Sequence, residues 1–248
     1  MAKEKKKKDK EEISQEKIKL NSEKVREREK RIKIIKIALL FLLIILIILY
    51  FLLRIVYEAG NFTVSLDQNF AQKSGIVMYE SKDEAQDKRI LYAQKAEFID
   101  NISVDWLPKN LNELGEGSHN GDNYLAYTFY IENKGSDIIN YWYTIIIDDV
   151  IKNVDKAIRV MVYRNEEQTL YAKPNEYTGN AENNTTSFYS ETQVLLQQRK
   201  EFKPGDIDKF TIVIFLEGDD PDCTDALIGG EIKMHMDITE EHIMPSEN

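Results

Sequence analysis

The sequence predicts an all-β extracellular domain, a β-sandwich of the jelly-roll type, preceded by one transmembrane helix and a charged N-terminal tail. Residues 37–53 are seventeen consecutive apolar residues. Residues 1–36 contain fifteen Lys and Arg against eight Asp and Glu, whereas the remainder of the chain is acidic. Residues 58–240 alternate short apolar runs with turn-rich pieces. We therefore expect a cytoplasmic tail, helical or disordered, at 1–33, a transmembrane helix at 34–57, the sandwich at 58–240 and a C-terminal tail at 241–248.

The apolar run is long enough to cross a membrane. With the apolar residues beyond Lys36 and Arg54, it reaches the ~20 residues that a helix needs to span about 30 Å of hydrocarbon. A cleaved signal peptide is the competing interpretation. We favour a retained signal anchor, because the apolar core exceeds the ~7–15 residues of such a peptide and no small-x-small cleavage sequence follows it. We expect Ile37, Leu42, Leu46 and Leu53 to lie within the membrane.

Charge sets the predicted orientation of the chain. After residue 36 the sequence keeps 18 basic and 35 acidic residues, out of 33 and 43 in the whole chain. Lys and Arg that flank a membrane helix stay in the cytoplasm. We therefore expect a single-pass protein of the cell membrane with its N-terminus inside and its acidic domain outside. Such an acidic domain disfavours binding to nucleic acid or to anionic lipid.

Strand patterns dominate the predicted outer domain. Period-two alternation is clearest in residues 231–239, where one set of side chains is apolar and the other polar. In residues 138–148 and 210–216 both alternating sets are largely apolar, which predicts central strands covered on both faces. The other expected strands are 61–66, 75–79, 90–93, 102–107, 123–132, 157–163, 169–172 and 188–196. About ten strands with only short helical signals indicate a sandwich, and residues 178–186 indicate an exposed loop.

The sequence gives no support for catalysis. His119, His235 and His242 lack the spacing of a zinc site, and the chain has no His-Glu-x-x-His, Cys-x-x-Cys, Gly-x-Ser-x-Gly or phosphate-binding loop. The single cysteine, Cys223, cannot form an internal disulfide. We interpret it as an inert, half-buried residue rather than as a cross-link to a partner. The chain is therefore expected not to be an enzyme and to have no small-molecule substrate.

The densest polar cluster is the turn at residues 217–225. Its four candidate calcium ligands are Asp219, Asp220, Asp222 and Asp225. Calcium is the one candidate cofactor, because such oxygen-rich loops suit it. The alternative, which we favour, is a structural turn. Gly218 and Pro221 turn the chain, Asp222 or Thr224 caps a short helix through Ile228, and Gly229 and Gly230 end it before the last strand.

The C-terminal stretch at residues 202–237 contains Phe-Leu-Glu-Gly-Asp-Asp-Pro-Asp-Cys-Thr-Asp-x-Leu-Ile-Gly-Gly after a Lys-Pro-Gly-Asp turn. It resembles the end of the TasA/camelysin family of Gram-positive envelope and biofilm-matrix proteins. The resemblance implies a jelly-roll domain, a bacterial extracellular location and polymerisation into matrix fibres. Two features depart from the family. Its members are typically exported by a cleaved signal peptide, and no zinc signature of camelysin, described as a metallopeptidase, can be matched residue by residue.

These patterns together predict a membrane-anchored bacterial surface protein that binds another protein or a second copy of itself. Exposed strand edges are natural templates for such association. One alternative is a membrane-tethered envelope metallopeptidase, which would need converging histidines and carboxylates. The other is a structural subunit of an envelope-spanning secretion or sporulation complex, which would need a defined partner that co-purifies through the membrane.

Overall fold

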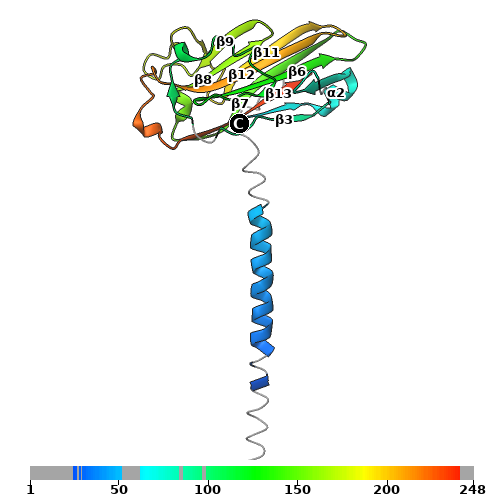
Figure 1. Cartoon of the computed structure of the whole chain (residues 1–248), viewed down its shortest axis with the longest axis vertical. Helices are drawn as coiled ribbons and strands as arrows, with labels where there is room; N and C mark the ends of the chain where they lie inside the picture. The colour runs from blue at the N-terminus through cyan, green and yellow to red at the C-terminus, as the bar shows by residue number, and fades with distance from the viewer. Residues whose placement is uncertain are drawn as a thin grey trace, which may run out of the picture. The chain divides into compact units, whose positions relative to one another are not determined.

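The structure is a computed structural model that describes residues 25–26, 28, 30–51, 62–83, 86–96 and 99–240. The chain divides into two compact units, Met1–Glu58 and Ala59–Asn248 (Figure 1). In the first unit the helix Lys30–Phe51 is long and apolar enough to cross a membrane, a test that a signal sequence also passes. Ile37, Leu42 and Leu46 lie exposed on this helix. Leu53, residues 1–24 of the tail and residues 241–248 lie outside the described residues.

The second unit contains two mixed β-sheets. Sheet A consists, in spatial order, of β11 (Gln193–Phe202), β7 (Ile139–Ile151), β13 (Glu231–Thr239), β1 (Phe62–Leu66) and β3 (Ile90–Tyr92). Sheet B consists of β10 (Thr186–Ser187), β9 (Glu167–Ala172), β8 (Ile158–Arg164), β12 (Ile207–Glu217), β6 (Tyr124–Asn133) and β2 (Ile76–Tyr79), with β4 (Asn101–Ile102) on β12 and β5 (Gly117–Ser118) on β6. Most neighbours are antiparallel, whereas β1 and β13, β9 and β10, and β4 and β12 run parallel.

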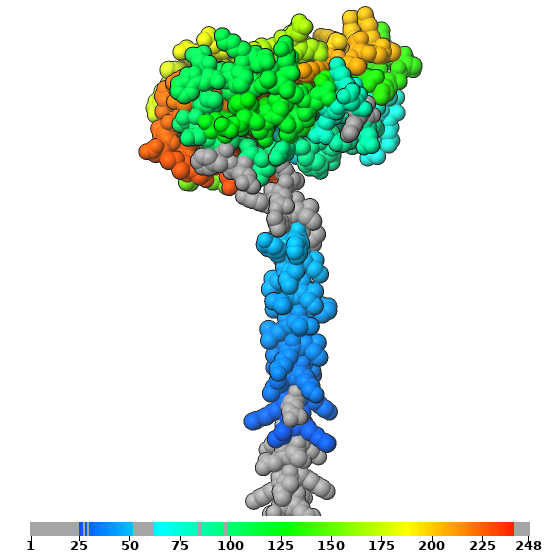
Figure 2. Space-filling model, in the orientation of Figure 1, coloured from blue at the N-terminus to red at the C-terminus, as the bar shows by residue number. Residues whose placement is uncertain are grey.

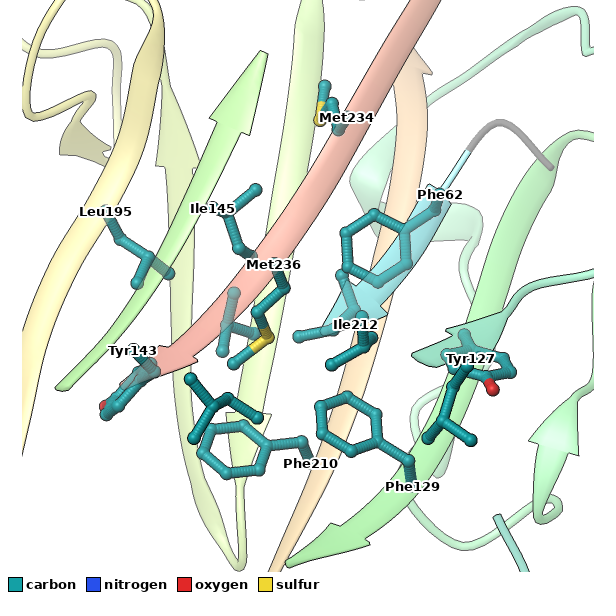
Figure 3. Packing of buried hydrophobic residues seen from close by; sticks show 14 of the residues in the cluster. Phe62, Tyr127, Phe129, Tyr143, Ile145, Leu195, Phe210, Ile212, Met234 and Met236 are labelled. Carbon is teal, nitrogen blue, oxygen red and sulfur yellow. The ribbon is translucent and has the colours of Figure 1, made fainter. Parts of the chain in front are cut away.

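The inner faces of the two sheets share one hydrophobic core (Figure 3). On β13 the alternation predicted from the sequence is confirmed, since Met234, Met236 and Ile238 are buried while the intervening side chains are half-exposed. Across the core, Tyr143 of β7 packs edge-on against Phe210 of β12 with ring centroids 5.2 Å apart. Each large side chain buried here stabilises the fold by about 1.5–3 kcal/mol. This inter-sheet core joins the two sheets into one sandwich.

A second hydrophobic cluster lies on the outer face of sheet B. Its members are Leu107, Leu111, Tyr124, Ala126, Met161, Tyr163, Val213 and Phe215. Leu107 and Leu111 come from the segment 99–116, which connects β3 to β5 and covers this face. The central strand β12 is consequently buried on both faces, as its two apolar sets predicted.

For β7 the predicted central position is confirmed, since it lies between β11 and β13, but the predicted cover on both faces is wrong. Its inner residues Tyr141, Tyr143 and Ile145 are buried, but Trp142 and Ile146 on its outer face are only half-buried. In the part of the chain that the structure describes, none of the three hydrophobic clusters includes Trp142 or Ile146, so the outer face of sheet A stays open there. The outer faces of β12 and β7 are both apolar, but only that of β12 is covered. An apolar outer face therefore does not by itself show that a strand is covered.

Two predicted strands differ from the structure, and one helix was missed. The strand expected at 102–107 ends at Ile102, because η1 (Val104–Trp106) forms where the Leu107 amide donates to the Val104 carbonyl. The strand expected at 188–196 begins five residues later, as β11, because the preceding residues form a turn. The helix α2 (Gln68–Ser74) is capped by the Asp67 carboxylate and ends at Gly75, whose φ is 70°.

Candidate interaction surface

The edge strands of the two sheets differ in length. Within the described residues β10 spans two residues, β3 three and β2 four. On β2 the Met78 carbonyl also accepts a hydrogen bond from the Lys88 amide at 2.9 Å, so this edge is partly occupied. β11 spans ten residues, and β7 is the strand with which it pairs. Because an unpaired edge offers free N–H and C=O groups to another chain, β11 is the candidate binding element.

Only the middle of β11 is open. At its start the amides of Tyr189 and Ser190 donate to the carbonyls of Val194 and Gln193, at 3.1 and 3.0 Å, in a tight turn. The register with β7 shifts between Gln193 and Leu195, and again at the end between Arg199 and Phe202, and bulges of this kind block edge pairing in natural sheets. Between these two features lie Leu195, Leu196, Gln197 and Gln198, which we call the β11 edge.

A polar bridge holds the β11 edge in place. The Tyr143 hydroxyl of β7 donates to Gln197 Oε1 at 2.5 Å, and Gln197 Nε2 donates to the Tyr171 hydroxyl of β9 at 2.7 Å. Burial, opposed by the Arg164 charge, raises the pKa of Tyr143 to about 12, so this phenol remains a donor at neutral pH. The bridge crosses from sheet A to sheet B. The β11 edge is thus presented in a fixed position, which lowers the entropy cost of binding.

A buried carboxylate fixes the end of the same strand. Asp208 of β12 accepts hydrogen bonds from the Tyr141 hydroxyl at 2.5 Å, from Asn165 Nδ2 at 2.9 Å and from Arg199 Nε at 3.1 Å. Burial, together with the Asp208 charge, raises the pKa of Tyr141 well above its usual range. Arg199 therefore points inward from β11 and blocks strand pairing beyond Gln198.

An uncharged strip of sheet A lies beside the β11 edge. Leu196 is the partner of Thr144 in the register with β7, and Gln198 is the partner of Trp142. These side chains and Ile146 are half-buried. A strand added to the β11 edge would place every second side chain next to this strip, so that backbone hydrogen bonds supply affinity and side-chain contacts supply selectivity.

A chain of polar side chains crosses the open face of sheet A. The Ser65 hydroxyl of β1 donates to Asp237 Oδ1 at 2.5 Å, and His235 lies with Nε2 3.3 Å from Asp237 Oδ2 and Nδ1 2.8 Å from Asp148 Oδ1. Hydrogen bonding to Asp237, opposed by burial and aided by Asp148, raises the pKa of His235 to about 9. The imidazole is therefore a cation at neutral pH with both nitrogens engaged, which suits neither zinc binding nor general base catalysis.

His119 is not placed as a metal ligand either. Both ring nitrogens of His119 face backbone carbonyl oxygens, those of Gly117 at 3.1 Å and Leu111 at 3.2 Å. His242 lies outside the described residues. Among the residues that are described, no group of three or more His, Cys, Asp or Glu side chains is arranged to hold a metal ion.

The structure does not bring the four candidate calcium ligands together. Arg159 donates to Asp220 Oδ2 at 2.5 Å, in an ion pair whose side chains are 5% and 1% exposed. Asp219 Oδ2 accepts from the Ser103 hydroxyl at 2.6 Å, whereas Asp222 is half-buried and Asp225, at the start of η3 (Asp225–Leu227), is exposed. Calcium binding here stays a prediction, and the geometry favours the structural turn.

The free thiol of Cys223 is half-buried beside a small cluster formed by Val154, Ala157 and Leu227. Burial raises the pKa of this thiol, which lowers the fraction present as the reactive thiolate. The surroundings therefore favour the inert role over cross-linking.

Comparison with known proteins gives no family for this chain. No family model matches it, and no curated protein gives a significant match. Among solved structures it is similar to a β-glucosidase from Kluyveromyces marxianus in complex with glucose, with 12% identity and a TM-score of 0.24 over 68% of this chain and 15% of that chain. The selenomethionine-labelled form of the β-glucosidase from that organism gives 11% identity and a TM-score of 0.22 over 65% and 16%. The chain thus spans about a sixth of those proteins, and scores this low carry no conclusion about fold or function.

Proposed function

We propose that this chain is a single-pass membrane protein whose β-sandwich is presented outside the cell, where it binds a protein partner or a second copy of itself by strand addition. The observation that carries the proposal is the β11 edge, four residues of a ten-residue edge strand that lie between a turn and a bulge. The fixed position of this edge and the uncharged strip beside it support binding rather than catalysis.

The anchor and its orientation belong to the same proposal. The apolar helix supports a membrane segment, and the Lys-rich tail supports an inside N-terminus. Protease added to wall-free intact cells should degrade the sandwich and spare the tail. Protection of the sandwich would contradict this orientation, and a mature protein beginning near Gly60 would show a cleaved signal peptide instead.

Resemblance to TasA and camelysin proteins remains part of the proposal, as does the jelly-roll topology. The Phe-Leu-Glu-Gly-Asp-Asp-Pro-Asp motif lies at the end of β12 and in the turn after it. This location supports a structural rather than a catalytic role for the motif, because Asp220 forms a buried ion pair with Arg159.

Site-specific photo-crosslinking tests the binding surface directly. A photoreactive residue in place of Gln198 should yield a crosslinked partner, or a crosslinked dimer, in the native membrane. The same residue in place of Gln72, an exposed glutamine on α2, is the matched control and should yield none.

A charged residue introduced at the β11 edge tests whether this edge is needed to capture a partner. Leu196→Lys should abolish capture because a lysine on an edge strand opposes pairing. Leu114→Lys changes the same residue type at an exposed position of the segment 99–116 and should leave capture intact. Equal capture by both variants would refute strand addition at β11.

A further inference from the structure

The open face of sheet A carries two rows of side chains, because residues that are partners in register lie side by side on neighbouring strands. One row crosses all five strands through Leu196, Thr144, Asp237, Ser65 and Ile90. The other runs from β7 to β3 through Ile146, His235, Thr63 and Tyr92, and its continuation on β11, Gln193, is buried. In both rows the side chains of β13 and β1 are polar, and an apolar or aromatic side chain lies toward each edge of the sheet.

An aromatic ring lies on either side of this polar middle. Trp142 on β7 is half-buried, and Tyr92 on β3 is 53% exposed. In spatial order β13 and β1 lie between their strands, and Tyr92 shares its row with Ile146, four residues along β7 from Trp142. At a strand spacing of about 4.8 Å and a rise of about 3.4 Å per residue, the Cα atoms of Trp142 and Tyr92 lie roughly 20 Å apart. This span suits an extended ligand of several rings.

The charges within the two rows cancel. Asp237 is their one carboxylate and His235 their one cation, and His235 Nε2 lies 3.3 Å from Asp237 Oδ2. The other oxygen of Asp237 accepts from the Ser65 hydroxyl at 2.5 Å, and His235 Nδ1 lies 2.8 Å from Asp148 Oδ1 just beyond the rows. The polar middle is therefore held in place by its own contacts, and it offers no unpaired charge to a charged ligand.

This arrangement is the reverse of a protein interface, in which an apolar centre is surrounded by a polar rim. A sugar polymer has the complementary chemistry. Its hydroxyl groups both donate and accept hydrogen bonds, and the C–H faces of its rings pack on aromatic side chains. Asp237 and Ser65 keep oxygen lone pairs for such hydroxyls, because a carboxylate can accept about four hydrogen bonds and a hydroxyl two.

We propose that the open face of sheet A binds an uncharged, extended polysaccharide. Trp142 and Tyr92 stack on sugar rings at the two ends of the site, and the polar side chains of β13 and β1 bond to the hydroxyl groups between them. This activity goes beyond strand addition at β11, because both the class of ligand and most of the contact residues differ. Together with the proposed membrane anchor, it would tether the cell surface to such a polymer.

Calorimetric titration of the full-length chain, in a non-ionic detergent without a sugar headgroup, tests this assignment. The probes are three uncharged oligosaccharides, cellohexaose, chitohexaose and laminarihexaose. At least one should bind with a Kd of about 1 mM or tighter, and its affinity should change little with salt because no charge is paired. In a Trp106→Phe background the fluorescence of Trp142 should change on titration. Absence of binding to all three probes would overturn the proposal.

Matched aromatic variants locate the site. Trp142→Ala and Tyr92→Ala should each weaken binding about tenfold, because each removes one stacked ring. Trp106→Ala and Tyr177→Ala remove the same side chains at positions 79% and 85% exposed elsewhere, and should change affinity less than about twofold. Trp106 lies on the segment 99–116 over sheet B, and the turn to which this segment is bonded is seen in orange at one end of the sandwich in Figure 2.

Equal losses in the target and control variants would overturn the site. Thermal unfolding checks that Trp142→Ala is folded, and Tyr92→Ala carries the test by itself if it is not, since its side chain is exposed. Glucosamine hexamer and hexagalacturonate provide the charged probes. Tighter binding of either one than of the uncharged probes would overturn the choice of an uncharged ligand.

Tyr92→Ala also separates this proposal from strand addition. β3 and β11 are the opposite edges of sheet A, so this variant should lose the oligosaccharide and keep crosslinking at Gln198. Loss of both activities in Tyr92→Ala would overturn a separate polysaccharide site. Failure of crosslinking at Gln198 in the parent chain, with oligosaccharide binding intact, would refute strand addition alone.

Discussion

The outer face of sheet B is covered by another part of the chain, whereas the outer face of sheet A is open. Sheet B is covered by the segment 99–116, so that Phe215 and Leu111 are fully buried on the far side of the sandwich from the main core. Sheet A is open, and its outer residues Trp142 and Ile146 are half-buried around a chain of polar side chains. A covered face contributes to stability, whereas the binding that we propose would use the open face beside the unpaired edge.

The largest expected effect comes from emptying the covered face. Phe215→Ala removes a buried ring from the second cluster and should destabilise the sandwich by about 3–5 kcal/mol. Trp142→Ala, the corresponding aromatic truncation on the open face, should cost about 1–2 kcal/mol because its ring already contacts water. Urea unfolding of residues 59–248 measures both. Similar losses would mean that sheet A is covered by something outside the described residues.

The next effect concerns the turn that holds the covering segment. Asp220→Ala leaves Arg159 buried without its partner, and loss of one member of such a pair typically costs about 3–5 kcal/mol. The double change of Arg159 to Met and Asp220 to Leu should recover much of this loss, since it removes both charges. A single variant as stable as the parent in thermal unfolding would show that the pair does not secure the turn.

The sequence predicts the bounds of some strands well but does not predict which strand faces are covered. The strands β13, β12 and β7 show why. The bounds of β13 match its period-two pattern, because one face packs on the core and the other meets water. β12 and β7 have the same two-sided apolar pattern, yet one is covered and the other is not. The pattern reports what each strand could bury, whereas the cover depends on the path of the segment 99–116. That path depends on long-range bonds such as the one between Val104 and Glu217.

The candidate surface was harder to foresee than the fold. The run from Phe188 to Leu196 has strand character, but its first residues turn back on Val194, and the true strand continues into polar residues. Gln197 is exposed and Arg199 is half-buried, yet both bond across the sandwich, to Tyr171 and Asp208, and the sequence pattern does not indicate these bonds. Edge strands tolerate such polar side chains, so their limits are set by neighbours rather than by local pattern.

A smaller, pH-dependent effect is expected on the open face. The pKa of His235 is raised in the folded state from 6.5 to about 9, so its charge stabilises the sandwich fully below pH 6.5 and loses that effect as the pH rises through about 9. His235→Gln should therefore lower the melting temperature by about 1–3 °C at pH 6. The two proteins should converge above about pH 9 to 10. A gap that widens with rising pH would contradict the ion chain with Asp237 and Asp148.

Calcium should have the smallest effect. Because Asp220 is paired with Arg159 and Asp219 with Ser103, millimolar calcium is expected to leave the melting temperature unchanged within about 1 °C. A rise that disappears when Asp219, Asp220 and Asp222 are replaced by Ala would establish the calcium site instead.

Hydrogen exchange tests the contrast between the open and covered sides most directly. Amide exchange of the full-length chain in non-ionic detergent is measured by mass spectrometry with and without the partner identified by crosslinking. Strand addition predicts slower exchange on binding in residues 193–200, with no change in residues 107–116 or in β6. Protection confined to the segment 99–116 or to sheet B, with β11 unchanged, would contradict the assignment of the β11 edge as the binding surface.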